Sequence, residues 1–341
     1  MESLKTGWFM HSCRLFIAIA FAFFVTSCEK KEIPIVLEQE DDQEIVDSTE
    51  YEIHEVEFAM GESYDTQLWY DLESNAIVKT GSRFAWDIAF DCAKDEHWIS
   101  LNASVGMLAA NSGATNFNTV SSDAGLNFRA DHPWGLNDSL CLGEWWKTST
   151  VWVIDLGYNS DGTSRGKRKV QFSLLSDGNL EVHWANLNGN NEQTATIKKD
   201  GVYNRLGLSF KEGTQVNFEP MKTEYDLVFT RYQNIFYAPY QPYLVVGVLL
   251  NPYQTTAVEE WSVDFDDIDT LQAKSYNFTD IADIIGYDWK FFSLEDNFFT
   301  VFPDKNFLVR DQKGLTFKLR FLDFYDMNGV KGYPLMEVQR L

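Results

Sequence analysis

Short runs of alternating apolar and polar residues, separated by turn residues, recur along this chain and constrain its fold class. Residues 171–184, QFSLLSDGNLEVHW, place two such runs around the turn at residues 176–179. Period-two alternation is typical of half-buried strands, and Asp-Gly supports a tight turn between them. Residues 314–341 repeat the pattern, with Phe317 and Phe321 predicted to face the core and Lys318 to face solvent. We therefore predict a mainly β chain of antiparallel sheets packed as a β-sandwich.

Helices are expected to be few and short. The best candidate is the stretch FTDIADII at residues 278–285, in which Thr279 could act as the N-cap. Long amphipathic helical patterns are missing from the sequence.

The first 28 residues resemble a bacterial lipoprotein signal. Lys5 and Arg14 accompany an apolar run over residues 15–25, which is too short to span a bilayer. Val25, Thr26 and Ser27 stand directly before Cys28, as in a lipobox. We predict that a signal peptide, residues 1–27, is removed and that Cys28 carries the lipid. Acyl chains on this cysteine would anchor the protein to a membrane without a spanning helix.

The segment that follows Cys28 is acidic and nearly free of aromatic residues up to Tyr51. Such a composition buries too little apolar surface to fold, so we expect residues 28–50 to form a flexible tether. Residues 51–341 are predicted to be the β domain, with a division into two subdomains, about 51–219 and 220–341, left open. Acidic residues soon after a lipidated cysteine also resemble the signal that directs Bacteroidota-type lipoproteins to the outer face of the outer membrane.

The chain is strongly acidic, with a formal net charge of −23. A field of this sign repels the phosphates of nucleic acids and anionic lipid headgroups. We therefore exclude nucleic acid as a main partner, and we expect contact with the membrane through the lipid anchor only.

Two cysteines, Cys92 and Cys141, remain once Cys13 is removed with the signal and Cys28 is lipidated. In an oxidising compartment they could form a disulfide. Two buried free thiols are the alternative, and sequence spacing alone does not decide between them.

The common catalytic and phosphate-binding motifs are missing from the sequence, and no enzymatic activity is predicted. His97 and His132 fall in loop-like stretches, but no second ligand stands at metal-binding spacing, so we expect no metal site. The acidic run DFDDIDT at residues 264–270 lacks the glycine and terminal glutamate of an EF-hand and is interpreted as a solvated turn.

Two similar segments, FAWDIAFDC and TEYDLVFTR, each place an aspartate, Asp87 and Asp226, among apolar residues. Buried carboxylates need backbone or cationic partners, so we predict that both aspartates fix turns rather than take part in catalysis. The basic stretch RGKRK at residues 165–169 is interpreted as a charged hairpin tip.

Three stretches together resemble the HmuY family of outer-membrane-associated lipoproteins. They are WDIAFDCAKDEHWISLN, then EPMKTEYDLVFTRYQNIFY through YLVVGVLLNP, and finally IIGYDWKFF with FKLRFLDFYDMNGVKGYPLMEVQRL. The resemblance runs from about residue 55 to the C-terminus. It implies an all-β lipoprotein that captures haem at the cell surface and passes it to a TonB-dependent outer-membrane receptor.

The resemblance also implies two axial ligands, His or Met, from loops in the later part of the domain. This chain has no histidine after His183, and its later methionines are Met221, Met327 and Met336, so no axial ligand can be carried over by position. If a porphyrin binds, an aromatic-rich region offers stacking surface and a tyrosinate for ferric iron. The candidate residues are Tyr232, Tyr237, Tyr240, Tyr243 and Tyr253. The alternative is that these tyrosines pack in a sheet with their hydroxyl groups at its rim.

The sequence thus predicts a non-enzymatic, surface-exposed lipoprotein that binds haem or another flat or hydrophobic ligand for iron acquisition with an outer-membrane receptor. One rival is an interaction or glycan-binding module of the same fold that binds no haem. A second rival is a hydrolase of surface polysaccharide, which would need two carboxyl groups across a groove.

Overall fold

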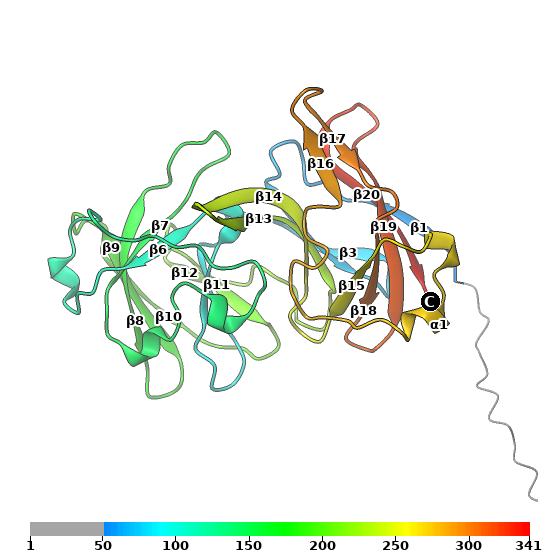
Figure 1. Cartoon of the computed structure of the whole chain (residues 1–341). Coiled ribbons are helices and arrows are strands. Elements are labelled where there is room, and N and C mark those ends of the chain that lie inside the picture. Colours follow the sequence, from blue (N-terminus) through cyan, green and yellow to red (C-terminus); the bar gives the residue numbers. More distant parts are fainter. Residues whose placement is uncertain (1–50) are drawn as a thin grey trace, which may run out of the picture. The chain divides into compact units, whose positions relative to one another are not determined.

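The computed structural model describes residues 51–341, which fold almost entirely into antiparallel strands (Figure 1). The predicted mainly β class is confirmed. Helical structure in this part of the chain is limited to one α-helix, α1 (Thr270–Ala273), and short 3₁₀ segments. These are η1 (Ala103–Val105), η2 (Phe117–Thr119), η3 (Asn137–Ser139), η4 (Trp145–Lys147) and η5 (Phe265–Asp267). None of the helices between residues 51 and 341 is long and apolar enough to cross a membrane. The predicted signal peptide, Cys28 and the tether lie outside the described residues.

Two sheets enclose one core and form what we call the C-terminal sandwich. One sheet has the strand order β1-β20-β19-β18-β15 and the other β14-β13-β2-β3. The strands are β1 (His54–Glu57), β2 (Thr66–Asp71), β3 (Ala76–Ser82), β13 (Leu227–Tyr237), β14 (Tyr240–Leu250), β15 (Thr256–Glu260), β18 (Asn306–Arg310), β19 (Thr316–Tyr325) and β20 (Lys331–Arg340). Side chains from both sheets, such as Leu68, Phe229 and Phe321, are buried together between them. Burial of each such side chain contributes about 1.5–3 kcal/mol.

A second pair of sheets, here the inserted sandwich, lies between β3 and β13 in the chain. Its strand orders are β10-β9-β8-β7-β6 and β12-β11-β4-β5. The strands are β4 (Ile88–Asp91), β5 (Ile99–Leu101), β6 (Leu108–Asn111), β7 (Trp152–Asp155), β8 (Lys167–Leu174), β9 (Leu180–Asn186), β10 (Gln193–Ile197), β11 (Arg205–Ser209) and β12 (Thr214–Val216). Phe90, Val182 and Trp184 belong to its separate core. The hairpin predicted over residues 171–184 is confirmed, since β8 pairs with β9.

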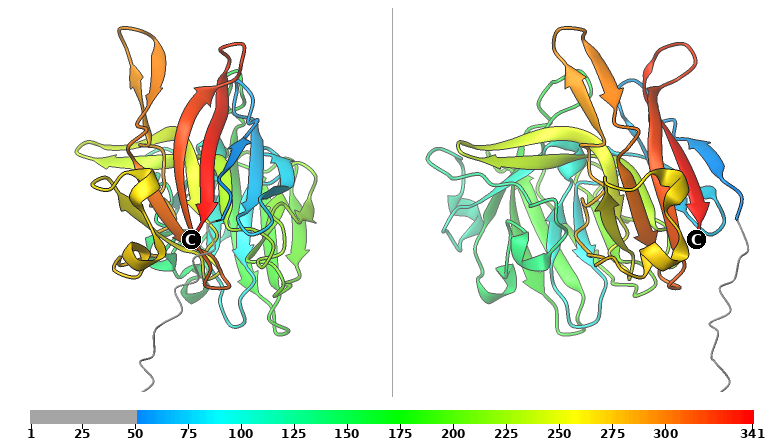
Figure 2. Two further views of the ribbon diagram at one scale, coloured as in Figure 1. Left: turned by 90° about the vertical axis from the view of Figure 1, so that its right-hand side faces the viewer. Right: turned by 45° about the vertical axis from the view of Figure 1, so that its right-hand side comes forward.

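Two hairpins extend from the C-terminal sandwich. The β13–β14 hairpin pairs over its whole length, from Leu227 opposite Leu250 to Tyr237 opposite Tyr240, and its outer half reaches the inserted sandwich (Figure 1). The shorter hairpin, β16 (Lys290–Ser293) with β17 (Phe298–Val301), projects beyond the sheets in both views of Figure 2.

The division of the chain between the two cores does not follow the order of the sequence. Residues 58–72 pack with the strands after residue 227, whereas residues 88–210 form the other core. The N-terminal strands therefore belong with the C-terminal half, because they pair with β13 and β20. The predicted subdomain boundary near residue 219 stays a prediction.

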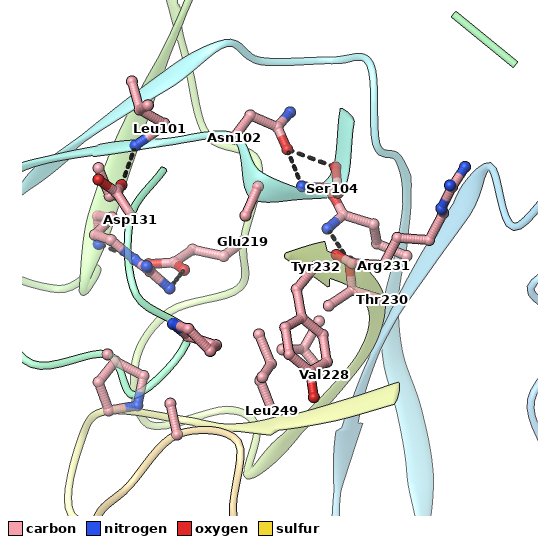
Figure 3. Close-up of a pocket in the computed structure, with 18 of the residues that line it drawn as sticks. Leu101, Asn102, Ser104, Asp131, Glu219, Val228, Thr230, Arg231, Tyr232 and Leu249 are labelled. Carbon is pink, nitrogen blue, oxygen red and sulfur yellow. Dashed lines mark hydrogen bonds and ion pairs between the residues drawn. The ribbon is translucent and has the colours of Figure 1, made fainter. Parts of the chain in front are cut away.

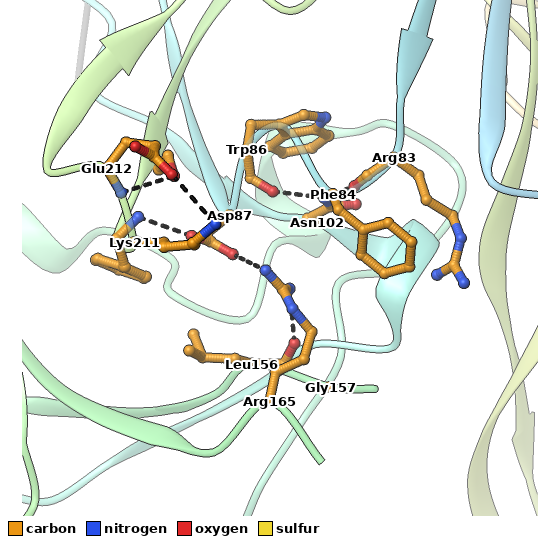
Figure 4. A network of polar contacts seen from close by, with 12 residues as sticks. Arg83, Phe84, Trp86, Asp87, Asn102, Leu156, Gly157, Arg165, Lys211 and Glu212 are labelled. Atoms are coloured by element: carbon orange, nitrogen blue, oxygen red, sulfur yellow. Dashed lines mark hydrogen bonds and ion pairs between the residues drawn. The ribbon is translucent and has the colours of Figure 1, made fainter. Parts of the chain in front are cut away.

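The two similar aspartates have the structural role that the sequence predicts. Asp87 accepts a hydrogen bond from the Phe210 backbone N–H at 2.7 Å and forms an ion pair with Arg165 at 2.7 Å (Figure 4). Asp226 accepts a hydrogen bond from the Leu72 backbone N–H at 2.9 Å. Each buried carboxyl group thus ties the start of a strand to a segment distant in sequence. The predicted backbone and cationic partners are confirmed, and the absence of a catalytic role stays a prediction.

Several predictions about charged residues are wrong, because three basic side chains that were expected to face solvent are buried or largely buried. Arg165 is not at a hairpin tip but is largely buried against Asp87, and Lys169 of the same basic stretch is buried with its Nζ donating to the Phe117 carbonyl. Lys318 does not face solvent, because its Nζ donates to the carbonyls of Phe265 and Ile268. Alternation predicts which face of a strand a residue occupies, but not whether that face is exposed. Here loops cover the outer face, and their backbone carbonyl groups accept hydrogen bonds from the lysines.

The helix predicted over residues 278–285 is absent from the structure. Instead, Thr279 exchanges backbone hydrogen bonds with Ala257 of β15, and the residues that follow form a turn in which the Ile284 N–H donates to the Ile281 carbonyl. Cys92 and Cys141 are both free thiols, which is the second of the two alternatives. Burial raises the pKa of the Cys92 thiol to about 11.

Candidate functional site

The five candidate tyrosines do not form one platform. Tyr232 is buried midway along the β13–β14 hairpin, whereas Tyr237 and Tyr243 near its tip are 66% and 54% exposed. Tyr240 is engaged structurally: its hydroxyl accepts a hydrogen bond from the Ala130 N–H at 2.9 Å. Tyr253 follows β14 and lies in a separate cleft. Closeness in sequence does not bring these rings together, because neighbours in a strand alternate between its faces.

The tip of the β13–β14 hairpin is an exposed aromatic surface, which we call the hairpin tip. The ring of Tyr237 stacks with His132 at a centroid distance of 6.0 Å, and His132 contacts Trp134 at 4.2 Å. The Arg129 guanidinium lies 4.2 Å from the Tyr240 ring centroid. The tip therefore packs against the loop after Arg129 and leaves Tyr237 largely uncovered.

A cleft of about 490 Å³ has a mixed aromatic and cationic lining. This volume lies within the usual range for small-molecule sites, roughly 300–1,000 Å³. Its rings are those of Trp98, Tyr203 and Tyr253, and its cations are Arg205 and Lys222. Its remaining lining residues are Asp91, Ala93, Ser100, Gly135, Leu136, Asn137, Leu140, Asn204 and Pro252.

The loops that carry Lys222 and Tyr253 are held together by a buried asparagine. The Asn251 Nδ2 donates to the carbonyls of Lys222 and Tyr225, and its Oδ1 accepts from the Tyr253 N–H at 2.9 Å. This places the Lys222 Nζ 4.8 Å from the Tyr253 ring centroid. The Lys222 ammonium group therefore makes a cation–π contact with the ring of Tyr253 at one wall of the cleft.

Arg205 is the second cation of the cleft and is oriented by a buried acid. Glu219 accepts a hydrogen bond from the Arg205 backbone N–H at 2.6 Å, and its other oxygen lies 3.7 Å from the guanidinium. Burial raises the pKa of Glu219, although Arg205 counteracts the shift. The Arg205 side chain is 38% exposed, whereas that of Glu219 is 1% exposed. The guanidinium thus has a face left for a ligand.

A smaller central cavity of about 150 Å³ adjoins the cleft. Figure 3 shows Asp131 and Glu219 on one side of it and Val228 and Tyr232 of β13 on the other. Ser100, Gly135, Leu140, Arg205 and Pro252 line both spaces. The two spaces therefore meet at this group of residues.

Metal-binding groups are sparse in the structure. Among residues 51–341, no three or more His, Cys, Asp or Glu side chains come together in a way that could hold a metal ion. The His132 Nδ1 accepts a hydrogen bond from the Trp134 N–H at 3.3 Å, and the His183 Nε2 lies 2.7 Å from Glu192. Of the later methionines, Met336 is fully buried, Met327 is 97% exposed on a hairpin loop, and Met221 is 39% exposed next to Lys222.

Sequence analysis identified only one residue of the cleft, Tyr253. Trp98, Tyr203, Arg205 and Lys222 were not singled out, because they come from segments that no motif connects. The available signal was weak: Lys222 lies in one of the stretches that resemble the HmuY family, and so does Trp98.

Comparison with known proteins gives a family and several distant structures. A model of the HmuY protein family matches residues 63–337. Apo PinO from Porphyromonas gingivitis is 9% identical, with a TM-score of 0.36, and the match covers 85% of this chain and 97% of that one. A Bacteroides vulgatus protein described as HmuY-like and heme-binding is 10% identical, with a TM-score of 0.21 and coverage of 84% and 90%. The apo HmuY analogue of Tannerella forsythia is 8% identical, with a TM-score of 0.24 and coverage of 86% and 98%. No curated protein matches the chain.

Proposed function

The chain belongs to the HmuY family, and from this premise we propose that it captures haem, or a similarly flat ligand with carboxylate groups, in the cleft. A haem has an apolar ring system and two propionates. The cleft offers Trp98, Tyr203 and Tyr253 for the ring, and Arg205 and Lys222 for the carboxylates. This combination of rings and cations in one concave site is the observation that carries the proposal.

The residues of the cleft also fit a ferric iron at the centre of such a ligand. A tyrosinate is an established type of haem ligand. Of the candidate tyrosines, Tyr253 lines the cleft, whereas the hydroxyl of Tyr240 already accepts a hydrogen bond from the Ala130 N–H. We therefore assign the iron-binding oxygen to Tyr253. The haem would supply iron for uptake, and the protein's residues would bind and orient it.

The place of action belongs to the same proposal. Lipidation of Cys28 would hold the folded domain at the outer membrane, and the acidic segment after it favours display on the cell surface. A ligand captured there needs an importer, and a TonB-dependent receptor is the partner that the family resemblance implies. Palmitate labelling of the wild-type protein, compared with Cys28→Ala, tests the anchor independently of the ligand.

A haem titration tests the ligand assignment. Adding haem to the purified protein should shift the Soret band and show a charge-transfer band typical of tyrosinate ligation. Tyr253→Phe should remove that band, whereas Tyr237→Phe, at the exposed hairpin tip, should leave the spectrum unchanged. No spectral change at micromolar haem would end the haem proposal. A band that is lost only in Tyr237→Phe would move the site to the hairpin tip.

A second candidate function is an interaction module without haem, and it is favoured by the projecting β16–β17 hairpin. Phe291 and Phe298 on this hairpin are 46% and 48% exposed, and Leu294 at its tip is 89% exposed. Exposed apolar side chains of this kind often contact a partner protein. If the protein binds no haem but Leu294→Asp abolishes binding to outer-membrane receptors in a pull-down, this second function replaces the first.

A further inference from the structure

An exposed row of aromatic rings, here the aromatic row, lies beside the β16–β17 hairpin. It consists of Trp261, which directly follows β15, Phe302, which directly follows β17, and Phe291 of β16. Trp261 is 50% exposed and Phe291 is 46% exposed. The ring centroid of Phe302 lies 5.8 Å from that of Trp261 and 5.4 Å from that of Phe291. The three rings therefore form one continuous surface, which is separate from the cleft and from the central cavity.

The rings of the aromatic row are held in place by polar contacts. The Trp261 Nε1 donates to the Glu259 carboxylate, and the Lys305 Nζ lies 5.0 Å from the Trp261 ring centroid. The Phe302 N–H donates to the Trp289 carbonyl at 2.9 Å, which ties the end of the hairpin to its start. Rings that are fixed before a ligand arrives lose little conformational entropy on binding, so the row is preorganised.

Two carboxylates lie beside the row, and one buried cation orients both. The Lys305 ammonium forms ion pairs with Glu259 at 2.7 Å and with Asp288 at 2.8 Å, and its side chain is 1% exposed. The Glu259 and Asp288 side chains are 31% and 63% exposed, so they remain accessible to a ligand from solvent. This group therefore presents hydrogen-bond acceptors next to the rings, and its formal charge is −1, from two carboxylates and one ammonium.

The combination of exposed rings and oriented carboxylates fits a sugar. The flat faces of a pyranose ring carry C–H groups, which are attracted to the negative face of an aromatic ring. The hydroxyl groups at its edge donate hydrogen bonds, and such bonds are stronger when the acceptor is a carboxylate. A sugar that carries carboxylates or sulfates is disfavoured, because the group is already negative and the whole chain has a formal net charge of −23.

The size and charge of the row favour a sugar over other ligands. Three aromatic side chains that are about half exposed offer roughly 200–400 Å² of surface, whereas a stable protein interface buries about 800 Å² on each partner. A cationic ligand is also less favoured, because Lys305 already pairs with both carboxylates. A short neutral glycan needs only rings and hydrogen-bond acceptors, and the row supplies both.

We propose that the aromatic row binds a neutral oligosaccharide built from hexopyranose units. Its sugar rings stack on Trp261 and Phe291, and its hydroxyl groups donate to Glu259 and Asp288. The site is additional to the proposed haem cleft and does not depend on haem binding. It also does not include Leu294, on which the test of the interaction module relies.

Calorimetric titration of the purified protein with cellohexaose, maltohexaose and mannohexaose tests this site, with hexagalacturonate as the acidic counterpart. At least one neutral hexasaccharide should bind, and hexagalacturonate should bind at least about tenfold more weakly. Trp261→Ala should weaken binding of that neutral hexasaccharide by at least about tenfold, because it removes the largest ring of the row. Trp134→Ala is the matched control, since Trp134 is 47% exposed and lies outside the row, and it should change the affinity by less than about twofold.

Phe291 and Phe292 provide a second comparison within one strand. They are neighbours on β16 and are 46% and 41% exposed, but their side chains lie on opposite faces of the strand. The ring of Phe292 contacts that of Phe299 at a centroid distance of 4.8 Å and so belongs to the other face. Phe291→Ala should weaken sugar binding by about three- to tenfold, whereas Phe292→Ala should change it by less than about twofold.

Several outcomes would overturn the proposal. Absence of binding by all three neutral hexasaccharides ends it, and so does tighter binding of hexagalacturonate. Equal losses in Phe291→Ala and Phe292→Ala, or in Trp261→Ala and Trp134→Ala, would show that the sugar does not lie on the row. If no sugar binds but Trp261→Ala abolishes binding to outer-membrane receptors in a pull-down, the row contacts a protein instead. All of these results are independent of the haem titration.

Discussion

The cleft and the hairpin tip are both rich in aromatic residues, but they differ in enclosure and in charge. At the hairpin tip Tyr237 and Tyr243 are mostly exposed, and the nearby Arg129 is engaged with the ring of Tyr240. In the cleft, rings from three separate segments surround a concave space that also contains Arg205 and Lys222. Aromatic content alone therefore does not make a ligand site. The cleft is the better candidate, because its rings and cations converge on one concave space in which stacking and recognition of carboxylates can combine.

The largest expected effect concerns Asp226, which lies at the base of β13 and supports the loops of the cleft through Asn251. The Asn251 N–H donates to the Asp226 carbonyl at 2.7 Å. Desolvation by burial raises the pKa of Asp226 to about 7, compared with about 3.9 in an unfolded chain. Between these values the folded protein retains a proton that the unfolded chain releases, so the free energy of unfolding should fall as the pH rises from about 4 to 7.

Asp226→Asn stays neutral over this range and should lose less stability on going from pH 5 to pH 8. Over this pH range, the difference in the free energy of unfolding between Asp226→Asn and the wild type should change by on the order of 3 kcal/mol. Urea denaturation at several pH values measures it. Parallel stability curves for the two proteins would contradict a buried, proton-retaining Asp226. Haem affinity measured at the same pH values shows whether the cleft loosens together with this support.

Charge reversal in the cleft should have the next largest effect. Lys222→Glu removes a partner for a ligand carboxylate and adds repulsion, so haem affinity should fall by about ten- to thirtyfold. The matched control is Lys211→Glu, which makes the same change of charge at a side chain that is 88% exposed and outside the cleft lining. Equal losses in the two variants would mean that only the net charge of the protein matters.

Removing one tyrosine ring, from either the cleft or the hairpin tip, distinguishes these two candidate ligand sites more directly. Tyr253→Ala should reduce haem affinity by at least about tenfold, because it removes the proposed iron-binding oxygen together with stacking and buried area. Tyr243→Ala at the hairpin tip removes the same side chain and should change the affinity by less than about twofold. If Tyr243→Ala causes the larger loss of haem affinity and Tyr253→Ala the smaller one, the ligand binds at the hairpin tip instead.

The smallest effect is expected at Tyr240, where the role is structural. Tyr240→Phe keeps the ring under Arg129 but leaves the Ala130 N–H without its acceptor. We expect a loss of about 1 kcal/mol in the free energy of unfolding with unchanged haem affinity. A weaker haem complex with unchanged stability would show that this hydroxyl contacts the ligand.

Local features of this molecule could be predicted from sequence, but the cleft could not. Alternation located the hairpins over residues 171–184 and 314–341, and the apolar surroundings of Asp87 and Asp226 predicted their buried, hydrogen-bonded state. These features depend on neighbours in the chain or on the chemistry of a single side chain. The burial of Arg165 and Lys318 depends instead on partners far away in sequence, which local patterns do not reveal.

The cleft illustrates the same limit. Its rings and cations lie at positions 98, 203, 205, 222 and 253, and they meet because residues 88–216 fold as an insertion between strands of the C-terminal sandwich. Sequence analysis instead favoured the dense tyrosine segment after residue 231. Strand geometry disperses that segment over two faces and a tip, and only Tyr253, outside it, reaches the cleft.

A crystal structure of the protein with bound haem tests the central claim most directly. We predict that the porphyrin lies in the cleft, with its propionates at Arg205 and Lys222 and its iron next to the Tyr253 hydroxyl. A porphyrin bound against Tyr237 at the hairpin tip, or against Phe291 and Phe298 of the β16–β17 hairpin, would contradict the account.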